Sequence, residues 1–201
     1  MIIGYHLIWT AYGWWLPNDP RGSTSQQVRL DVIRELGELH LGRKEVQPAR
    51  RVVQQFYDRA ADNLRHPLLT LDEGARGEVG VAFARAIDER GLTCYACAIM
   101  PDHVHILIRK HRLSGEDMIQ ALQGASRTAL IESGNRSILH PTWTAGHGWI
   151  VFLDTPEDIQ RTIGYIEQNP LKIGLPAQKW SFVRPYDGWP YHQESKHIAC
   201  G

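Results

Sequence analysis

Two short apolar runs separated by two residues constrain the fold of this chain more than any other feature. Residues 92–100 (LTCYACAIM) and 103–110 (HVHILIRK) are rich in β-branched, aromatic and aliphatic side chains. Runs of this length and composition predict β-strands. Because Pro101 and Asp102, which separate the runs, are typical turn residues, we predict that the two strands form an antiparallel hairpin.

The second of these strands carries two histidines in an otherwise apolar run. Side chains alternate between the faces of a strand, so His103 and His105 share one face, while Val104, Ile106 and Ile108 share the other. The apolar face is expected to pack on helices. Two imidazoles at this spacing can hold one divalent metal ion and leave positions open for substrate oxygens. Such a pair on its own is explained equally well by hydrogen-bonded surface histidines.

Hydrophobic periodicity predicts the remaining elements of an α+β protein. A strand is expected at 2–10, helices at 71–91 and 114–132, a strand at 146–154 and a final helix at 155–170. With the hairpin, this order gives the βαββαβ pattern of a ferredoxin-like (RRM-like) sheet, followed by a C-terminal helix. We predict one domain over 1–201, with a helical insertion at 24–70 (short amphipathic helices at 30–39 and 49–64) and an irregular, aromatic-rich tail at 171–201.

Composition and charge exclude several classes of protein. The 22 basic residues balance the 22 acidic ones, which argues against a protein that coats nucleic acid through a broad basic stripe. The apolar fraction of 43% is typical of a globular protein. The N-terminus, MIIGYHLIWT, lacks the basic stretch and cleavage site of a signal peptide. No run approaches the ~18 apolar residues of a membrane helix, so we expect no membrane segment and a cytoplasmic location.

The cysteines are interpreted as structural. Cys94 and Cys97 form a Cys-x-x-Cys motif inside the predicted strand 92–100. Strict alternation would point the two side chains to opposite faces, where they cannot share a metal ion. Both are therefore predicted to be small core residues, and the total of three cysteines suits a reducing cytoplasm.

The helix predicted at 155–170 carries a tyrosine outside its apolar stripe. Thr155 is expected to cap its N-terminus, with Pro156 in the first turn, and the helix is expected to end before Pro170. The stripe consists of Ile159, Ile163 and Ile166, and the polar face carries Asp158, Arg161, Tyr165 and Asn169. A tyrosine beside an arginine and an amide is typical of an active-site arm. For this helix alone, a partly buried tyrosine with its hydroxyl in water is the simpler explanation.

Together, the histidine strand and the tyrosine helix resemble the single-tyrosine HUH transposases, named for histidine, hydrophobic residue, histidine. MPDHVHILI (100–108) resembles the HUH strand of the REP-associated tyrosine transposase branch, and YIEQNPLKIGL (165–175) resembles its tyrosine helix and following turn. Two further stretches fit this branch, WTAYGWWLPNDPRG (9–22) and WSFVRPYDGWPYH (180–192). The resemblance thus covers nearly the whole chain.

The resemblance implies a metal-dependent endonuclease and strand transferase that acts on single-stranded DNA in transposition and recombination. It implies that His103 and His105, with Asn169, hold Mg²⁺ or Mn²⁺. It also implies that Tyr165 is the nucleophile, which becomes joined to the 5′ phosphate. The implied partner is single-stranded or hairpin DNA, such as REP-like palindromes, bound in the nucleoid by a monomer or homodimer.

Side chains suited to holding DNA lie in the loop after the first strand, at the end of the histidine strand, on the tyrosine helix and in the tail. Unpaired bases stack on aromatic rings interleaved with cations. The predicted DNA contacts are Trp14, Trp15, Arg21, Arg109, Lys110, Arg112, Arg161 and Arg184, with Trp180, Tyr186 and Trp189 as further tail aromatics. Some of these aromatics are expected to pack over the sheet instead. His6, His111, His140 and His147 are predicted to be structural or surface groups, with His147 nearest the site.

Two other classes of function stay open. A domesticated relative that binds a DNA hairpin without cutting it would keep the fold and lose the chemistry. The intact set of His103, His105 and Tyr165 favours retained chemistry, although Asp102 and Glu167 replace an Asn and a His of the branch and would tune or weaken it. An RNA-binding ferredoxin-like domain would need exposed aromatics on the two central strands, where this chain carries its histidines.

Overall fold

The computed structural model describes residues 1–16, 18–22, 48–144, 146 and 148–191. Its elements are β1 (Gly4–Thr10), α2 (Arg50–Ala61), α3 (Glu73–Arg90), β2 (Cys94–Ile99), β3 (His103–Arg109), α4 (Gly115–Glu132), β4 (Trp149–Leu153) and α5 (Pro156–Lys172). The insertion contributes α2, while the helix predicted at 30–39 lies outside the described residues. None of the described helices is long and apolar enough to cross a membrane.

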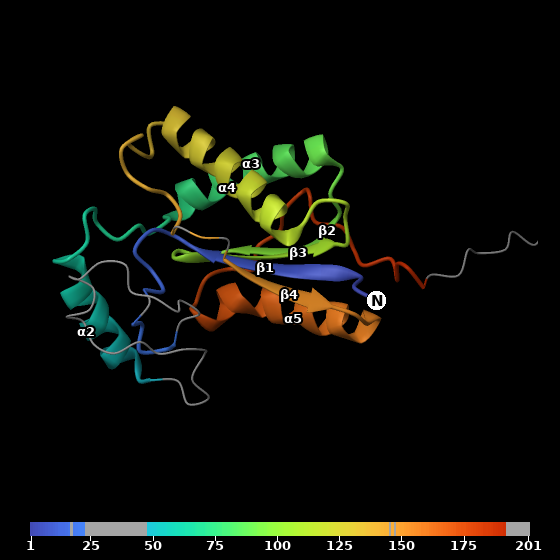
Figure 1. Ribbon diagram of the computed structural model, residues 1–201, viewed down its shortest axis with the longest axis horizontal. Coiled ribbons are helices and arrows are strands. Elements are labelled where there is room, and N and C mark those ends of the chain that lie inside the picture. Colours follow the sequence, from blue (N-terminus) through green and yellow to red (C-terminus); the bar gives the residue numbers. More distant parts are fainter. Residues whose placement is uncertain (17, 23–47, 145, 147, 192–201) are drawn as a thin grey trace, which may run out of the picture.

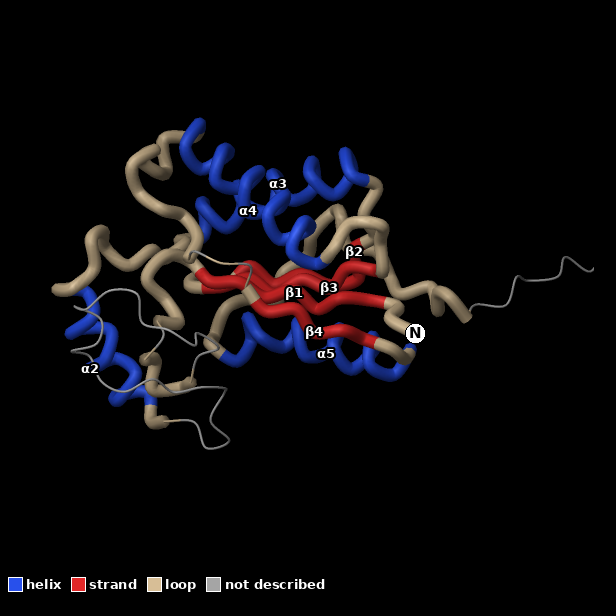
Figure 2. The backbone as a smooth tube through the Cα atoms, in the orientation of Figure 1, coloured by secondary structure: helices blue, strands red, loops and turns tan. Residues whose placement is uncertain are grey.

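The four strands form one antiparallel sheet in the order β2-β3-β1-β4. Helices α3 and α4 lie on one face of this sheet and α5 lies on the other, as Figure 1 and Figure 2 show. Helix α2 lies beyond one end of the strands (Figure 1). The predicted α+β fold is therefore confirmed, with α3 and α4 connecting the strands and α5 added after the last one.

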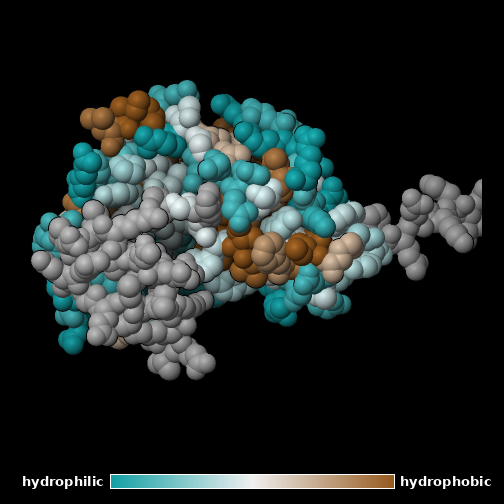
Figure 3. All heavy atoms as spheres, in the orientation of Figure 1, coloured by the Kyte–Doolittle hydropathy of each residue, from teal (hydrophilic) through white to brown (hydrophobic). Residues whose placement is uncertain are grey.

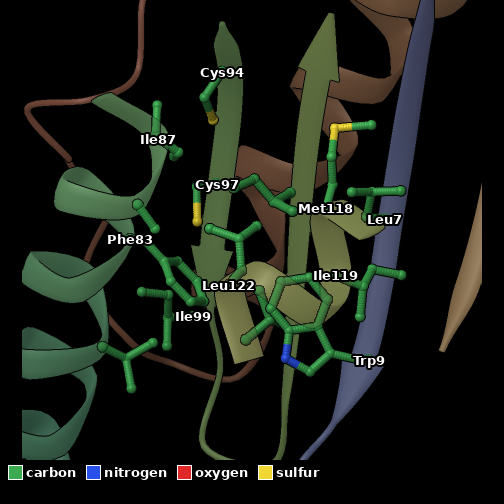
Figure 4. Close-up of a cluster of buried hydrophobic side chains, with 14 of the residues drawn as sticks. Leu7, Trp9, Phe83, Ile87, Cys94, Cys97, Ile99, Met118, Ile119 and Leu122 are labelled. Carbon is green, nitrogen blue, oxygen red and sulfur yellow. The ribbon is translucent and has the colours of Figure 1, made fainter. Parts of the chain in front are cut away.

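Alternation along the strands directs apolar side chains toward α3 and α4. Val104, Ile106 and Ile108 of β3 are fully buried in this layer, as predicted. Leu7 and Trp9 of β1 point into the same cluster (Figure 4). Because these alternate positions fill the core, the intervening positions of β1 and β3 face α5.

Cys94 and Cys97 belong to the same core cluster, which corrects the prediction that they point to opposite faces. The pairing of β2 with β3 shifts in register between Cys94 and Ala96. An irregularity of this kind inserts an extra residue and breaks the strict alternation of side chains. Both thiols are buried among apolar side chains (Figure 4), and burial raises the pKa of both. The prediction that they are core residues is confirmed.

Helix α5 begins as predicted and ends later than predicted. The Thr155 hydroxyl accepts a hydrogen bond from the backbone N–H of Asp158, and Pro156 occupies the first turn. The predicted end before Pro170 is wrong, because the helix continues to Lys172. Pro170 lies in the last turn, where its missing N–H costs a single helical bond, and it is buried. The last turn therefore adds Lys172 to the helix.

The two edges of the sheet differ. At β2, the tail covers the edge: the side chain of Gln178 accepts from the N–H of Ile99 and donates to its C=O, both at 2.8 Å. At β4, Val151 and Phe152 are exposed, and Figure 3 shows apolar atoms gathered over this strand. The tail thus closes one edge of the sheet by side-chain contacts and by a backbone bridge between Val183 and Cys94.

Candidate active site

The histidine pair lies on the face of the sheet that α5 covers. The ring centroids of His103 and His105 are 4.8 Å apart. His105 is buried, while His103 is partly exposed. The strand thus presents two neighbouring imidazoles on the side opposite Val104, as the alternation predicts.

A third imidazole, from His6 on β1, joins the pair. Its Nε2 lies 2.9 Å from Nδ1 of His105, which is hydrogen-bonding distance. Burial lowers the pKa of His6 to about 4, so this ring is neutral at pH 7. His6 was predicted to be a structural or surface group; it is buried, and the sequence did not predict its contact with His105. His147, the histidine expected nearest the site, lies outside the described residues.

The sequence does contain a signal for His6. Like the pair on β3, it interrupts an apolar strand on the face opposite the core residues Tyr5 and Leu7. Strand pairing then sets His6 opposite Leu107, two residues along β3 from His105. Alternation alone identifies the face, but only the register between strands shows that the two rings meet.

Asp102, in the turn before β3, is bonded to His103. Its Oδ1 lies 2.6 Å from Nδ1 of His103. Burial alone would raise the pKa of the Asp102 carboxyl, but the hydrogen bond and charge of His103 and the charge of Arg21 outweigh it and hold this pKa below its usual range. Asp102 is therefore an ionised carboxylate at neutral pH and accepts from the imidazole.

Helix α5 brings Tyr165 to the histidines. The centroid of its ring lies 5.5 Å from that of His105 and 6.0 Å from that of His6. The side chain is 37% exposed, so a substrate can reach it from solvent. Gly4 of β1 allows α5 to approach, because a Cβ there would lie 2.6 Å from Cδ1 of Ile159. Three elements far apart in the sequence therefore place three imidazoles and one phenol together.

Other residues of α5 flank the tyrosine. The Nδ2 of Asn169, one turn later, donates to the C=O of Tyr165 at 3.1 Å. The Nζ of Lys172 lies 4.7 Å from the centroid of the Tyr165 ring, within cation–π range. Asp158 and Arg161, predicted on the same face, form an ion pair. Lys172 had no predicted function, because the helix was predicted to end before it.

The predicted ligands would offer a divalent cation two imidazole nitrogens and one amide oxygen. The amide oxygen suits Mg²⁺ or Mn²⁺, which usually retain water or substrate oxygens as well, whereas imidazoles are more typical ligands of softer divalent metals. Within the described part of the chain, no three His, Cys, Asp or Glu side chains form a group that could hold a metal ion. A third protein ligand would therefore be of another type, and the amide of Asn169 is of that type.

The loop after β1 uses its predicted DNA contacts for its own packing. Arg21 donates from Nε and Nη2 to the buried carboxylate of Asp19, at 3.0 and 2.8 Å. The same group donates to the hydroxyl of Tyr57 on α2 at 3.1 Å and stacks 4.0 Å from the centroid of the Trp15 ring. With a side chain only 19% exposed, Arg21 holds the loop to α2, and its contact with DNA stays a prediction.

The remaining predicted DNA contacts divide into packed aromatics and exposed cations. Trp14 donates from Nε1 to the C=O of Leu69 at 2.7 Å. Trp180 lies so close to Gly80 of α3 that a Cβ there would be 2.2 Å from its ring. Both tryptophans therefore pack the fold. The cations that reach the surface are Lys110, Arg112, Arg161 and Arg184, and Arg109 is partly exposed with its guanidinium 5.2 Å from the Trp189 ring.

The fold and site define an α+β protein whose sheet presents histidines to a tyrosine on a covering helix. Residues 62–169 match a family model described as "Transposase IS200 like". This match covers more than half of the chain, and the chain belongs to this family of transposases, which are DNA-processing proteins. The histidine pair and the tyrosine lie inside the matched region, whereas His6 and Lys172 lie outside it.

Two solved structures are similar to this chain. One is a REP-associated tyrosine transposase bound to a REP hairpin, 18% identical, with 56% of this chain and 65% of that chain covered and a TM-score of 0.42. The other, from Deinococcus radiodurans R1, is described as a transposase and is 17% identical, with 88% and 94% covered and a TM-score of 0.39. No curated protein matches the chain. The chain spans 65% of the first structure, and the TM-scores of both structures are low. Family membership therefore rests on the match to the family model.

Proposed function

We propose that the protein is a metal-dependent, single-strand DNA endonuclease and strand transferase that uses Tyr165 as its nucleophile. The observation that carries this proposal is the 5.5 Å separation between the ring centroids of Tyr165 and His105. A surface histidine pair and an unrelated surface tyrosine would have no reason to converge from distant parts of the chain. Membership of a transposase family supports DNA as the substrate.

His103 and His105, with Asn169, are the residues proposed to hold Mg²⁺ or Mn²⁺. An ion bound by them would polarise the scissile phosphate and offset the negative charge that develops there in the transition state. Both imidazoles stand on β3, an inner strand of the sheet, which gives them a rigid base. Asn169 lies on the same helix as the nucleophile, so the two keep a fixed spacing.

Tyr165 is proposed to attack the phosphorus through its hydroxyl oxygen. A bond from this oxygen to phosphorus forms, and the bond from phosphorus to the 3′ oxygen of the preceding nucleotide breaks. The phenol loses a proton and the leaving oxygen gains one, which yields a 5′ phosphotyrosine and a free 3′ hydroxyl. Because one phosphodiester replaces another, the reverse reaction rejoins strands without ATP.

Hairpin DNA with a single-stranded flank is the proposed substrate. The similar solved transposase is described as bound to a REP hairpin. The exposed Lys110 and Arg112 after β3, and Arg161 on α5, are available to phosphates. Since the histidines and the tyrosine come from one chain, a monomer contains all the side chains of the proposed site. We further propose that the protein acts on DNA in the nucleoid.

A nicking assay tests this function. Hairpin DNA labelled at either end of its flank is incubated with the full chain and Mn²⁺ and then separated under denaturing conditions. We expect the fragment with the new 5′ end to migrate with the protein and the other fragment to be released. Tyr165→Phe removes only the hydroxyl and should bind the hairpin without cutting it. A wild-type protein that binds the hairpin and cuts nothing would favour the alternative, a DNA-hairpin-binding protein without catalytic activity.

A further inference from the structure

We propose that His6 and Asp102 are positioning residues for the two histidines of β3. His6 holds Nδ1 of His105, and Asp102 holds Nδ1 of His103. In both histidines this leaves Nε2 as the metal-binding atom. This inference rests on one part of the proposed function, the binding of a divalent cation by His103 and His105. It assigns functions to two residues that touch neither the nucleophile's hydroxyl nor the ion.

The contact between Asp102 and His103 fixes the proton on one ring. Oδ1 of Asp102 lies 2.6 Å from Nδ1 of His103, and a carboxylate oxygen is a hydrogen-bond acceptor. This contact therefore assigns the proton to Nδ1 of His103, which donates it. In a neutral imidazole the other nitrogen then has the free lone pair, so Nε2 of His103 is the atom able to bind a cation. Carboxylates that accept from a ligating histidine are common partners of protein metal sites and strengthen the ligand.

The contact between His6 and His105 allows two arrangements, of which a bound cation selects one. Nε2 of His6 and Nδ1 of His105 are 2.9 Å apart, and either nitrogen could carry the proton between them. If His105 donates, its proton lies on Nδ1 and the lone pair of Nε2 can bind the ion; if His6 donates, Nε2 of His105 carries the proton and cannot. Metal binding therefore requires His6 to be the acceptor. Burial of both rings keeps water from taking the place of either partner.

The two contacts act on the orientation of the rings as well as on the proton. Each histidine is held at Nδ1 by a side chain from a different part of the sheet, β1 for His105 and the turn before β3 for His103. The orientation of both rings is thus set before the ion arrives, and at His103 the position of the proton is set as well. Loss of such a partner typically weakens metal affinity by about 10–100-fold.

Metal affinity in the absence of DNA tests the inference. Mn²⁺ is titrated into the full-length protein, and the free ion is measured by electron paramagnetic resonance. We expect His6→Leu and Asp102→Ala each to weaken the Mn²⁺ dissociation constant by about 10–100-fold. His6→Gln keeps an acceptor at the position of Nε2, and Asp102→Asn keeps one beside His103, so both should recover most of the affinity. The matched control is His66→Leu, since His66 packs on Tyr12 and His140 outside the site.

A second measurement keeps the inference testable if a variant folds poorly. Nitrogen-15 shifts of labelled histidines in the metal-free wild type should show His103 protonated at Nδ1. Wild-type affinity in folded His6→Leu and Asp102→Ala would overturn the inference, as would a His103 ring protonated at Nε2. If the wild type itself binds no Mn²⁺, the metal-dependent function fails and this inference fails with it. If the wild type binds Mn²⁺ and cuts DNA, and His6→Leu and Asp102→Ala bind Mn²⁺ with the same affinity, only the inference on His6 and Asp102 fails.

Discussion

Lys172 places a positive charge beside the proposed nucleophile. Its Nζ lies 4.7 Å from the Tyr165 ring centroid, and a cation there would stabilise charge on the phenol oxygen and the phosphate as they react. Because the side chain is exposed, solvent screens part of this effect. We expect Lys172→Gln to slow formation of the covalent DNA adduct by about 10-fold, or ~1.4 kcal/mol in the barrier, measured in single-turnover reactions.

The conservative variant and a matched control separate charge from packing. Lys172→Arg should keep most of the rate, since it keeps the cation. Lys179→Gln removes an exposed cation from the tail and should leave the rate unchanged. Equal rates for Lys172→Gln and the wild type would show that this lysine has no part in the reaction.

Arg21 and Arg161 were both predicted to contact DNA, and the structure separates them. Arg21→Gln leaves the buried Asp19 carboxylate without its ion pair and should lower the free energy of unfolding by roughly 3 kcal/mol. Arg161→Gln alters an exposed residue and should change stability by less than about 0.5 kcal/mol. If Arg161 meets a phosphate, its loss should reduce the salt slope of hairpin binding by about 1.

Urea unfolding and salt-dependent binding of the two arginine variants together give the test. In the opposite pattern, the Arg21→Gln variant is as stable as the wild type but binds DNA poorly. That result would show that Arg21 contacts DNA. The sequence could not distinguish these arginines, because both lie near aromatic or polar neighbours along the chain. Only the fold shows that Asp19 and Tyr57 enclose one of them.

Trp180 of the tail packs against Gly80 of α3. A Cβ at Gly80 would lie 2.2 Å from the ring of Trp180, a rigid group, while a Cβ at Gly77 meets nothing within 4 Å. Ala is a better helix former than Gly by about 1 kcal/mol. We therefore expect Gly77→Ala to stabilise the protein and Gly80→Ala to destabilise it by about 1–3 kcal/mol, because overpacking forces the tryptophan out.

Thermal unfolding of the two glycine variants measures this difference in stability directly. Because both glycines lie on α3, replacing either with Ala gives the same gain in helix propensity. If Gly80→Ala were as stable as Gly77→Ala, the tail would not be packed on α3 as the structure has it. The contact also explains why Trp180 serves packing, as was expected for some of the tail aromatics.

Most elements could be predicted because their signals are local. The capping box of Ser114 and Asp117 at the start of α4, and the cap of α5 at Thr155, follow from side chains within three residues of the helix start. The errors arise where tertiary contacts override a local rule. Burial lets α5 run through Pro170, and the register shift at Ala96 puts both cysteines in one core.

The two faces of the sheet divide packing from chemistry. Helices α3 and α4 cover the face that holds most of the core, and α5 covers the face with the imidazoles and the tyrosine (Figure 1). Sequence patterns could predict which residues share a face on each strand or helix. They could not predict that His6 contacts His105 or that Lys172 contacts Tyr165, because these contacts depend on strand register and helix length.

The balanced charge of the chain fits a protein that engages DNA locally. Basic and acidic residues are equal in number, so a broad electrostatic attraction to duplex DNA is not expected. Recognition would then depend on a few exposed cations around the site, and the histidine–tyrosine cluster would act only where a strand is delivered to it. The central claim is therefore that these side chains act together on one phosphodiester.

Mapping the covalent adduct tests that claim most directly. The full-length protein is incubated with flanked hairpin DNA and Mn²⁺, denatured and digested, and its peptides are analysed by mass spectrometry. We predict a nucleotide phosphate joined to the peptide that contains Tyr165, absent after chelation of the metal and absent from His103→Ala and His105→Ala. DNA cleavage with no adduct, an adduct on another residue, or an adduct that survives loss of both histidines would contradict the account.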